Sequence, residues 1–189
     1  MTTDIGTSSR RITRSKSGLL VVDFQERLLP AMFEKGRIVE NAVRLIRGSL
    51  ALGLPIWLTE QYRKGLGTTV PEVATAFPGA VPIEKLTFSA CGTPAVMAAL
   101  EARKVTDVIL CGIEAHVCVT QTCLDLLGQG YRPFVVADAT ASRTPANYHA
   151  GIDRMRDAGA VIVSTEMILF ELLERAGTDE FKQILGLVK

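Results

Sequence analysis

The chain has 189 residues, of which 48% are hydrophobic and 22% charged, and its formal net charge is +1. This composition is typical of one globular domain and excludes intrinsic disorder over most of the chain. The near balance of charge argues against a nucleic-acid-binding protein that relies on a basic excess. No apolar run approaches the roughly 20 residues of a membrane-spanning helix. We therefore expect neither nucleic-acid nor membrane partners.

Residues 1–17 are rich in Ser, Thr and Arg and contain a single acid, Asp4. We expect a flexible N-terminal arm over 1–17 and a folded domain over 18–189. The four cysteines form no CxxC pair, which favours reduced thiols and a cytoplasmic location. Because Arg- and Ser-rich, acid-poor starts are also typical of organelle-targeting peptides, a mitochondrial location stays open as the alternative.

From Gly18 onward, short apolar runs alternate with helical segments. Thr93–Pro94 and Thr144–Pro145 are start signals of helices, and Thr165 and Thr178 are interpreted as N-caps. The predicted strands, in chain order, are residues 18–23, 54–60, 81–85, 106–112, 132–138 and 160–164. The predicted helices are residues 36–52, 93–104, 116–129, 144–158 and 165–177, with a last short helix from 178.

Strands that are apolar throughout are typical of a parallel sheet with helices on both faces. Six such strands alternating with helices predict a doubly wound, Rossmann-like α/β fold with a six-stranded parallel sheet. Ligands of such folds bind beyond the carboxyl ends of the strands, near the topological switch point. The connection over residues 61–80 exceeds the usual loop length, so we expect it to be functional or to contain a short helix.

Several strand ends carry groups suited to catalysis. Asp23 ends the first strand, Lys85 the third and Asp138 the fifth, and Cys118 lies just after the fourth. No GxGxxG, P-loop, GxSxG or Asp-x-Asp motif accompanies the strands. The two histidines of the chain lie on different elements, so we expect no metal and no other cofactor.

Cys118 falls in the first turn of the helix predicted over 116–129. A helix N-terminus lowers the pKa of a thiol, a nearby lysine lowers it further, and a carboxylate can accept the proton. A free cysteine is more commonly a small buried hydrophobic residue, and Cys111 and Cys123 fit that interpretation. Cys118 lies off the apolar stripe and is therefore a candidate nucleophile with a lowered thiol pKa. His116, two residues earlier, leaves a Cys–His dyad as an alternative.

Three segments resemble the isochorismatase-like cysteine hydrolase superfamily: residues 18–25, KLTFSA at 85–90, and CGIEAHVCVTQTCLDLL at 111–127. The resemblance extends in particular to the small isochorismatase domain-containing proteins, through TEQYRKGLGTTVPE at 59–72 and the tail EFKQILGLVK. It covers about residues 18–188, with motif order and spacing in agreement.

The resemblance implies an Asp–Lys–Cys triad, carried onto Asp23, Lys85 and Cys118. The cysteine would attack a carbonyl carbon, the aspartate would take and return the proton, and the lysine would favour the charged pair. The resemblance also implies a cis peptide bond between Ile113 and Glu114. This bond would turn the backbone N–H groups of Glu114 and Cys118 toward an oxyanion hole.

The implied reaction is hydrolysis of an amide-type C–N bond or an ester in a small molecule through a cysteine thioester. Nicotinamidases of this superfamily hold a metal after the second strand, where TEQYRKGLGTT has neither His nor Cys. A metal and nicotinamidase activity are therefore not expected. Members commonly form oligomers, so we expect a dimer or tetramer. The candidate pocket residues are Phe24, Gln25, Gln61, Tyr62, Phe88 and His116.

Two other functions stay open. The first is hydrolysis of a vinyl ether, the isochorismatase reaction, without a covalent intermediate, although true isochorismatases typically lack the cysteine. The second is a non-catalytic interaction protein on the same fold, whose Cys118 would react no faster than an ordinary thiol.

Overall fold

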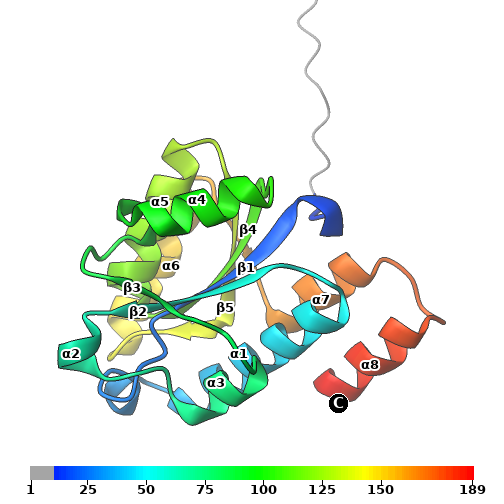
Figure 1. Ribbon diagram of the computed structural model, residues 1–189, viewed down its shortest axis with the longest axis horizontal. Coiled ribbons are helices and arrows are strands. Elements are labelled where there is room, and N and C mark those ends of the chain that lie inside the picture. The colour runs from blue at the N-terminus through cyan, green and yellow to red at the C-terminus, as the bar shows by residue number, and fades with distance from the viewer. Residues whose placement is uncertain (1–10) are drawn as a thin grey trace, which may run out of the picture.

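The computed structural model describes residues 11–189, which form a six-stranded parallel sheet between two layers of helices (Figure 1). The strand order is β3-β2-β1-β4-β5-β6. The strands are β1 (Ser17–Val22), β2 (Ile56–Gln61), β3 (Ile83–Lys85), β4 (Asp107–Ile113), β5 (Arg132–Ala141) and β6 (Val161–Val163). The predicted doubly wound α/β fold is confirmed.

The helices follow the predicted alternation with the strands. They are α1 (Lys35–Ala51), α2 (Arg63–Leu66), α3 (Pro71–Ala76), α4 (Pro94–Ala102), α5 (Thr120–Gly128), α6 (Pro145–Asp157), α7 (Thr165–Leu173) and α8 (Asp179–Val188). A π-helical turn, η4 (Ala115–Val119), leads directly into α5. The long connection over 61–80 contains α2 and α3. No helix in the described part of the chain combines the length and the hydropathy needed to cross a membrane.

The helix starts depend on capping by Ser and Thr. Thr144 and Thr178 accept backbone hydrogen bonds at the N-termini of α6 and α8, as predicted. The prediction that Thr165 caps α7 is wrong, because the side chain of Ser164 accepts the capping hydrogen bond and Thr165 is already helical. Thr93 stands at the N-cap position of α4, but its side chain forms no capping hydrogen bond.

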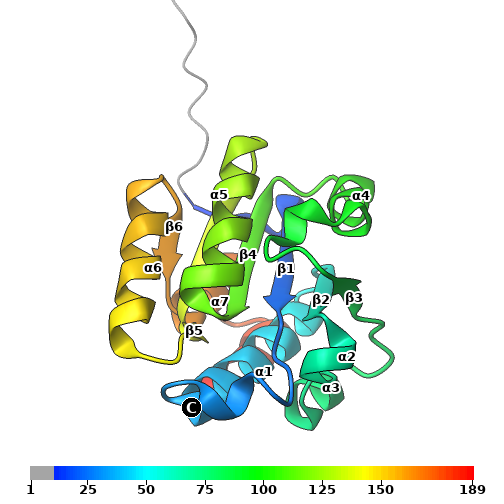
Figure 2. The same ribbon diagram turned by 90° about the vertical axis from the view of Figure 1, so that its left-hand side faces the viewer.

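The sheet separates two apolar cores. On one face β1 directs Leu19 and Val21 toward α1 and α7, with α3 and α8 beside them. On the other face Leu20 and Val22 belong to a second core, which α4, α5 and α6 cover (Figure 2). All six residues of β1 are buried, because successive side chains of a strand point to opposite faces and both faces are covered.

The expected flexible arm over 1–17 needs a correction in its second part. Residues 1–10 lie outside the described residues, but residues 11–17 are packed against the domain. Ile12 is 1% exposed. The Arg14 side chain donates from Nε to the carbonyl oxygen of Leu172 at 2.8 Å and forms an ion pair with Glu180 at 3.2 Å. The burial of Ile12 and the contacts of Arg14 therefore hold this segment against the domain, although it lies within the predicted arm.

Candidate active site

The three predicted triad residues meet at the carboxyl edge of the sheet. Asp23 follows β1, Lys85 is the last residue of β3, and Cys118 lies in η4 after β4. The strand order reverses between β1 and β4, so this edge is the topological switch point. Parallel strands present all their carboxyl ends at one edge, which brings together residues far apart in the sequence.

Asp23 and Lys85 form a fully buried ion pair. The Lys85 Nζ lies 2.7 Å from Asp23 Oδ2, and both side chains are 0% exposed. The hydroxyl of Thr59 donates to the other carboxylate oxygen, Oδ1, at 2.7 Å. Asp23 Oδ2 forms the ion pair but accepts no aligned hydrogen bond among the described residues. Thr59 thus holds Oδ1 in place, whereas Oδ2 can still accept a proton.

Burial controls the electrostatics of the site. Burial raises the pKa of Asp23, while the positive charge of Lys85 and the hydrogen bond from Thr59 oppose the rise. Burial, and next the charge of Asp23, raises the pKa of the Cys118 thiol to about 12, against the lowering effect of Lys85. The expected lowered thiol pKa is therefore wrong. Cys118 is 6% exposed and contributes to the apolar core, so desolvation outweighs the helix N-terminus and the lysine.

We predict that Thr59→Val raises the pKa of Asp23 further. The substitution keeps the shape of the side chain but removes a hydrogen bond that favours the charged carboxylate. Hydrogen bonds to charged groups contribute on the order of 1.5–3 kcal/mol, which corresponds to a rise of about one to two pH units. The carboxyl titration can be followed by ¹³C NMR of labelled aspartate. Thr75→Val, at an exposed position on α3, is the matched control. An Asp23 that titrates no higher in Thr59→Val than in the wild type would contradict the prediction.

The backbone around Cys118 is tightly packed. The peptide bond between Ile113 and Glu114 is cis. On α6, Gly151 lies so close to η4 that an added Cβ would come within 3.0 Å of Ala115 and of the His116 backbone nitrogen. The small size of Gly151 therefore lets α6 support the turn that carries the thiol.

The buried candidates for the pocket have structural partners instead. Phe24 is 1% exposed and packs in the core beside α1. Gln25 is 0% exposed, and its amide donates to the carbonyls of Gln61 and Gly67 and accepts from the Gln61 nitrogen. Gln61 accepts from Lys85 Nζ at 2.8 Å. Phe24 and Gln25 are therefore not available to a ligand.

The other three candidates lie nearer to solvent. Tyr62 and Phe88 are 49% and 54% exposed, next to the end of β3. His116 is half-buried, and its Nδ1 lies 2.9 Å from the hydroxyl of Ser142. The charged groups that act on Cys118 are Asp23 and Lys85, so the alternative of a Cys–His dyad gains no support.

The structure differs from the sequence analysis at two polar residues near strand ends, Asp138 and Thr59. Asp138 lies inside β5, which extends to Ala141, and its carboxylate accepts hydrogen bonds from the backbone and hydroxyl of Thr165. It therefore joins β5 to α7 and lies outside the triad. Thr59 was missed, although it is a polar residue near the end of a predicted strand. Its register with Val22 places it beside Asp23.

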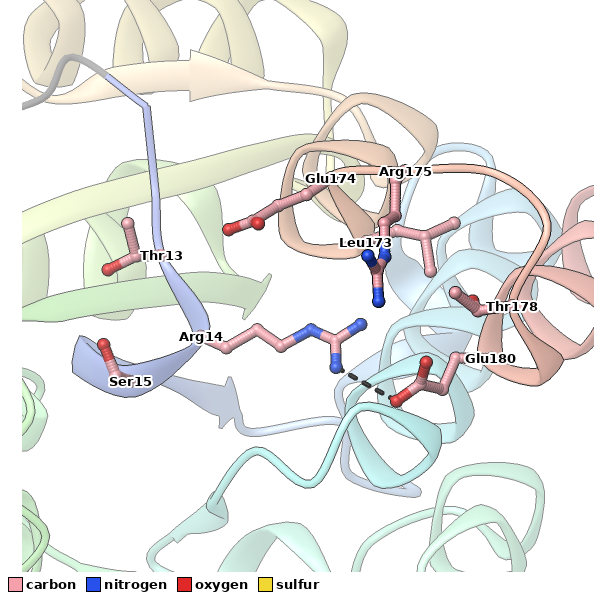
Figure 3. A pocket seen from close by; sticks show the side chains of 8 residues that line it. All are labelled: Thr13, Arg14, Ser15, Leu173, Glu174, Arg175, Thr178 and Glu180. Carbon is pink, nitrogen blue, oxygen red and sulfur yellow. Dashed lines mark hydrogen bonds and ion pairs between the residues drawn. The ribbon is translucent and has the colours of Figure 1, made fainter.

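A cavity of about 530 Å³ lies at the opposite edge of the sheet, ahead of β1 and beyond the end of α7 (Figure 3). Its charged lining comprises Arg14, Glu174, Arg175 and Glu180, two residues of each sign, and Arg14 pairs with Glu180. None of the predicted site residues lines it. Among residues 11–189, no three His, Cys, Asp or Glu side chains are grouped so that they could hold a metal ion. We therefore place the candidate site at the triad.

The fold and the cluster of Asp23, Lys85 and Cys118 together define a Rossmann-like α/β protein with a buried carboxylate, ammonium and thiol at its topological switch point. The family model described as the isochorismatase domain matches residues 17–167. Isochorismatase domain-containing protein 2 of Homo sapiens is 37% identical over 180 residues, which are 95% of this chain and 86% of that protein. The chain belongs to the isochorismatase family.

Solved structures show the same relationship. A MAR1 ribonuclease from Caenorhabditis elegans is 36% identical, with a TM-score of 0.88 over 94% of this chain and 92% of that one. YcaC from Escherichia coli, an octameric hydrolase of unknown specificity, is 27% identical, with a TM-score of 0.88 over 94% and 89%. YcaC from Pseudomonas aeruginosa, with hexane-2,5-diol and covalent acrylamide, is 28% identical, with a TM-score of 0.88 over 95% and 92%.

Proposed function

We propose that the protein is a hydrolase that cleaves an amide-type C–N bond or an ester of a small molecule through a thioester on Cys118. The observation that carries this proposal is the buried cluster of Asp23, Lys85 and Cys118 at the switch point of the sheet. Burying a carboxylate and an ammonium is costly, and strongly perturbed groups in one site favour a catalytic role.

Each member of the cluster has a distinct role. The raised pKa of Cys118 means that the thiol keeps its proton until a base removes it. Asp23 is that base, since its raised pKa moves its titration toward neutral pH and its Oδ2 can accept a proton. Lys85 favours the charged form of the carboxylate and stabilises the thiolate as it forms.

The reaction has two balanced halves. The Cys118 sulfur forms a bond to the carbonyl carbon, and the thiol proton moves to Asp23. The tetrahedral intermediate collapses, the C–N or C–O bond breaks, and Asp23 gives its proton to the leaving amine or alcohol. Water then attacks the thioester and gives a proton to Asp23. The C–S bond breaks, and the proton returns to the sulfur.

The developing oxyanion would be bound by the backbone N–H groups of Glu114 and Cys118, at the start of the helical segment formed by η4 and α5. Preorganised N–H donors stabilise charge that appears in the transition state, and loss of one donor typically costs about 3–4 kcal/mol. The side chain of Glu114 forms an ion pair with Arg143 at 2.9 Å, so only the backbone of Glu114 takes part in binding the oxyanion.

The relatives support both the chemistry and an assembly. Covalent acrylamide in YcaC from Pseudomonas aeruginosa favours a reactive nucleophile on this fold. The octameric YcaC of Escherichia coli favours a homo-oligomer for this chain as well.

The test is acylation by p-nitrophenyl acetate, an activated ester that needs no specific pocket. We expect a burst of p-nitrophenolate in the wild type and an acetyl group on the Cys118 peptide by mass spectrometry. Cys118→Ala should lose both, whereas Cys91→Ala, at the half-buried cysteine outside the cluster, should keep both. A panel of small amides and esters then identifies the substrate class.

Three outcomes would contradict the covalent mechanism. The first is turnover that survives in Cys118→Ala, which would favour a reaction without a covalent intermediate. The second is acetylation of Cys91 in place of Cys118. The third is cleavage of an RNA substrate that is unaffected by Cys118→Ala, which would favour the activity in the name of the Caenorhabditis elegans relative.

A further inference from the structure

The ammonium of Lys85 has a complete set of acceptors. Its Nζ lies 2.7 Å from Asp23 Oδ2, 2.8 Å from Gln61 Oε1 and 3.0 Å from the carbonyl oxygen of Phe88, with the carbonyl of Thr87 at 3.3 Å. An ammonium has three protons to donate, and a buried one is costly unless all are used. Only one of the side-chain acceptors, Gln61, is uncharged.

Gln61 is itself held at every polar group. Its Nε2 donates to the carbonyl of Leu86 at 2.9 Å, which turns the amide oxygen toward Lys85. Its backbone nitrogen donates to Gln25 Oε1 at 2.7 Å, and its backbone oxygen accepts from Gln25 Nε2 at 2.9 Å. Gln25 Nε2 also donates to the carbonyl of Gly67 at 2.7 Å. Gln25 therefore fixes the backbone of Gln61, and the carbonyl of Leu86 fixes its side-chain amide.

We propose that Gln61 is a positioning residue that directs the ammonium of Lys85 at Asp23 and thereby at the Cys118 thiol. Gln61 is 7% exposed, and its amide oxygen accepts from Lys85 Nζ, so it acts through Lys85. This inference rests on the proposed function, in which Lys85 stabilises the thiolate.

The consequence of losing Gln61 follows from the charges around the thiol. The titratable and charged groups that act on Cys118 are Asp23, which disfavours the thiolate, and Lys85, which favours it. Without the amide oxygen the ammonium loses its nearest uncharged acceptor, and Lys85 shifts toward the carbonyl oxygens of Thr87 and Phe88. The thiolate loses stabilisation, so its fraction at a given pH falls.

The experiment measures alkylation of Cys118 by iodoacetamide against pH, by peptide mass spectrometry, and needs no substrate. The variants are Gln61→Met, Lys85→Met, the double variant, and Gln183→Met on the exposed face of α8 as the matched control. We expect Gln61→Met to slow alkylation about tenfold at any pH below the thiol pKa, which is one pH unit of displacement. Gln183→Met should follow the wild-type profile.

The double variant shows whether Gln61 acts through Lys85. We expect it to match Lys85→Met, because Gln61 has no effect on the thiol once the ammonium is gone. Additive slowing in the double variant, or a wild-type profile in Gln61→Met with only a lower melting temperature, would overturn the proposal. If Gln61→Met does not fold, a folded double variant supports the coupling, and an unfolded one beside a folded Lys85→Met overturns it.

This readout separates the two proposals. Survival of p-nitrophenyl acetate turnover in Cys118→Ala would end the proposed function but leave the alkylation result on Gln61 intact. An unchanged alkylation profile in Gln61→Met, with turnover lost in Cys118→Ala, would end only the positioning role.

Discussion

Asp23→Asn should make the Cys118 thiol more reactive toward iodoacetamide, and Lys85→Met should make it less reactive, although both variants lose turnover. The charge and hydrogen bond of Asp23 raise the thiol pKa, whereas those of Lys85 lower it. Removing Asp23 leaves only burial against Lys85, so the thiol pKa falls below about 12. Removing Lys85 raises the thiol pKa further. When the thiol pKa moves by one pH unit, the thiolate fraction at pH values below it changes about tenfold.

In the proposed mechanism turnover needs the carboxylate as well as the thiol, so loss of Asp23 should reduce acylation by p-nitrophenyl acetate by about 10²–10⁴-fold. The measurement pairs alkylation rates at mildly alkaline pH with ester turnover for each variant. Asp157→Asn and Lys182→Met make the same substitutions at exposed positions and should change neither. Slower alkylation in Asp23→Asn, or faster alkylation in Lys85→Met, would contradict the electrostatic arrangement described above.

The wild-type pH profile follows from the same groups. Asp23 has a raised pKa, so its proton is lost as the pH rises through that value, and acylation should increase there. Since the thiol pKa is about 12, no second change from Cys118 is expected near neutral pH. Because Asp23 and Cys118 interact, the rise in acylation at the lower pH reports the titration of this pair and not of Asp23 alone.

Gly112→Ala should strongly destabilise the protein. Gly112 lies in β4 beside Val22 of β1, with φ +139°, a conformation that residues with side chains rarely adopt. An added Cβ would overlap the carbonyl oxygen of Val22 and lie 2.7 Å from its Cβ. Backbone strain and overpacking each cost about 1–3 kcal/mol, so we expect a loss of about 2–6 kcal/mol.

The free energy of unfolding is measured by urea denaturation, with Gly186→Ala as the control. Gly186 lies in α8, and an added Cβ there would meet no atom within 4 Å. A helical Gly→Ala substitution typically stabilises by about 0.5–1 kcal/mol. A Gly112→Ala protein with the wild-type midpoint and slope would show that the β1–β4 contact is more adaptable than its geometry indicates.

Prediction from sequence succeeded where a local signal and the global fold agreed. Apolar runs of strand length, Pro at helix starts and Thr at positions 144 and 178 indicated the alternation of elements and their approximate bounds. Prediction failed where two neighbouring residues could both cap a helix, and where the partners of a segment lie far away in the sequence. Ser164 and Thr165 are both good caps, and only the nearby Asp138 decides that Thr165 is engaged elsewhere. Residues 11–17 looked like an arm because their partners lie about 160 positions away.

The amino-acid sequence alone was enough to establish the doubly wound fold, the edge of the sheet where Asp23, Lys85 and Cys118 lie, and the family. Those properties depend on periodicity, strand ends and motif order, which are local along the chain. Three-dimensional packing was needed to show that Cys118 is buried and that its thiol pKa is raised rather than lowered. It was also needed to show that Gln61 accepts a hydrogen bond from Lys85 and is itself held by Gln25. Desolvation and hydrogen-bond partners depend on which distant segments surround a group, and no spacing in the sequence specifies those neighbours.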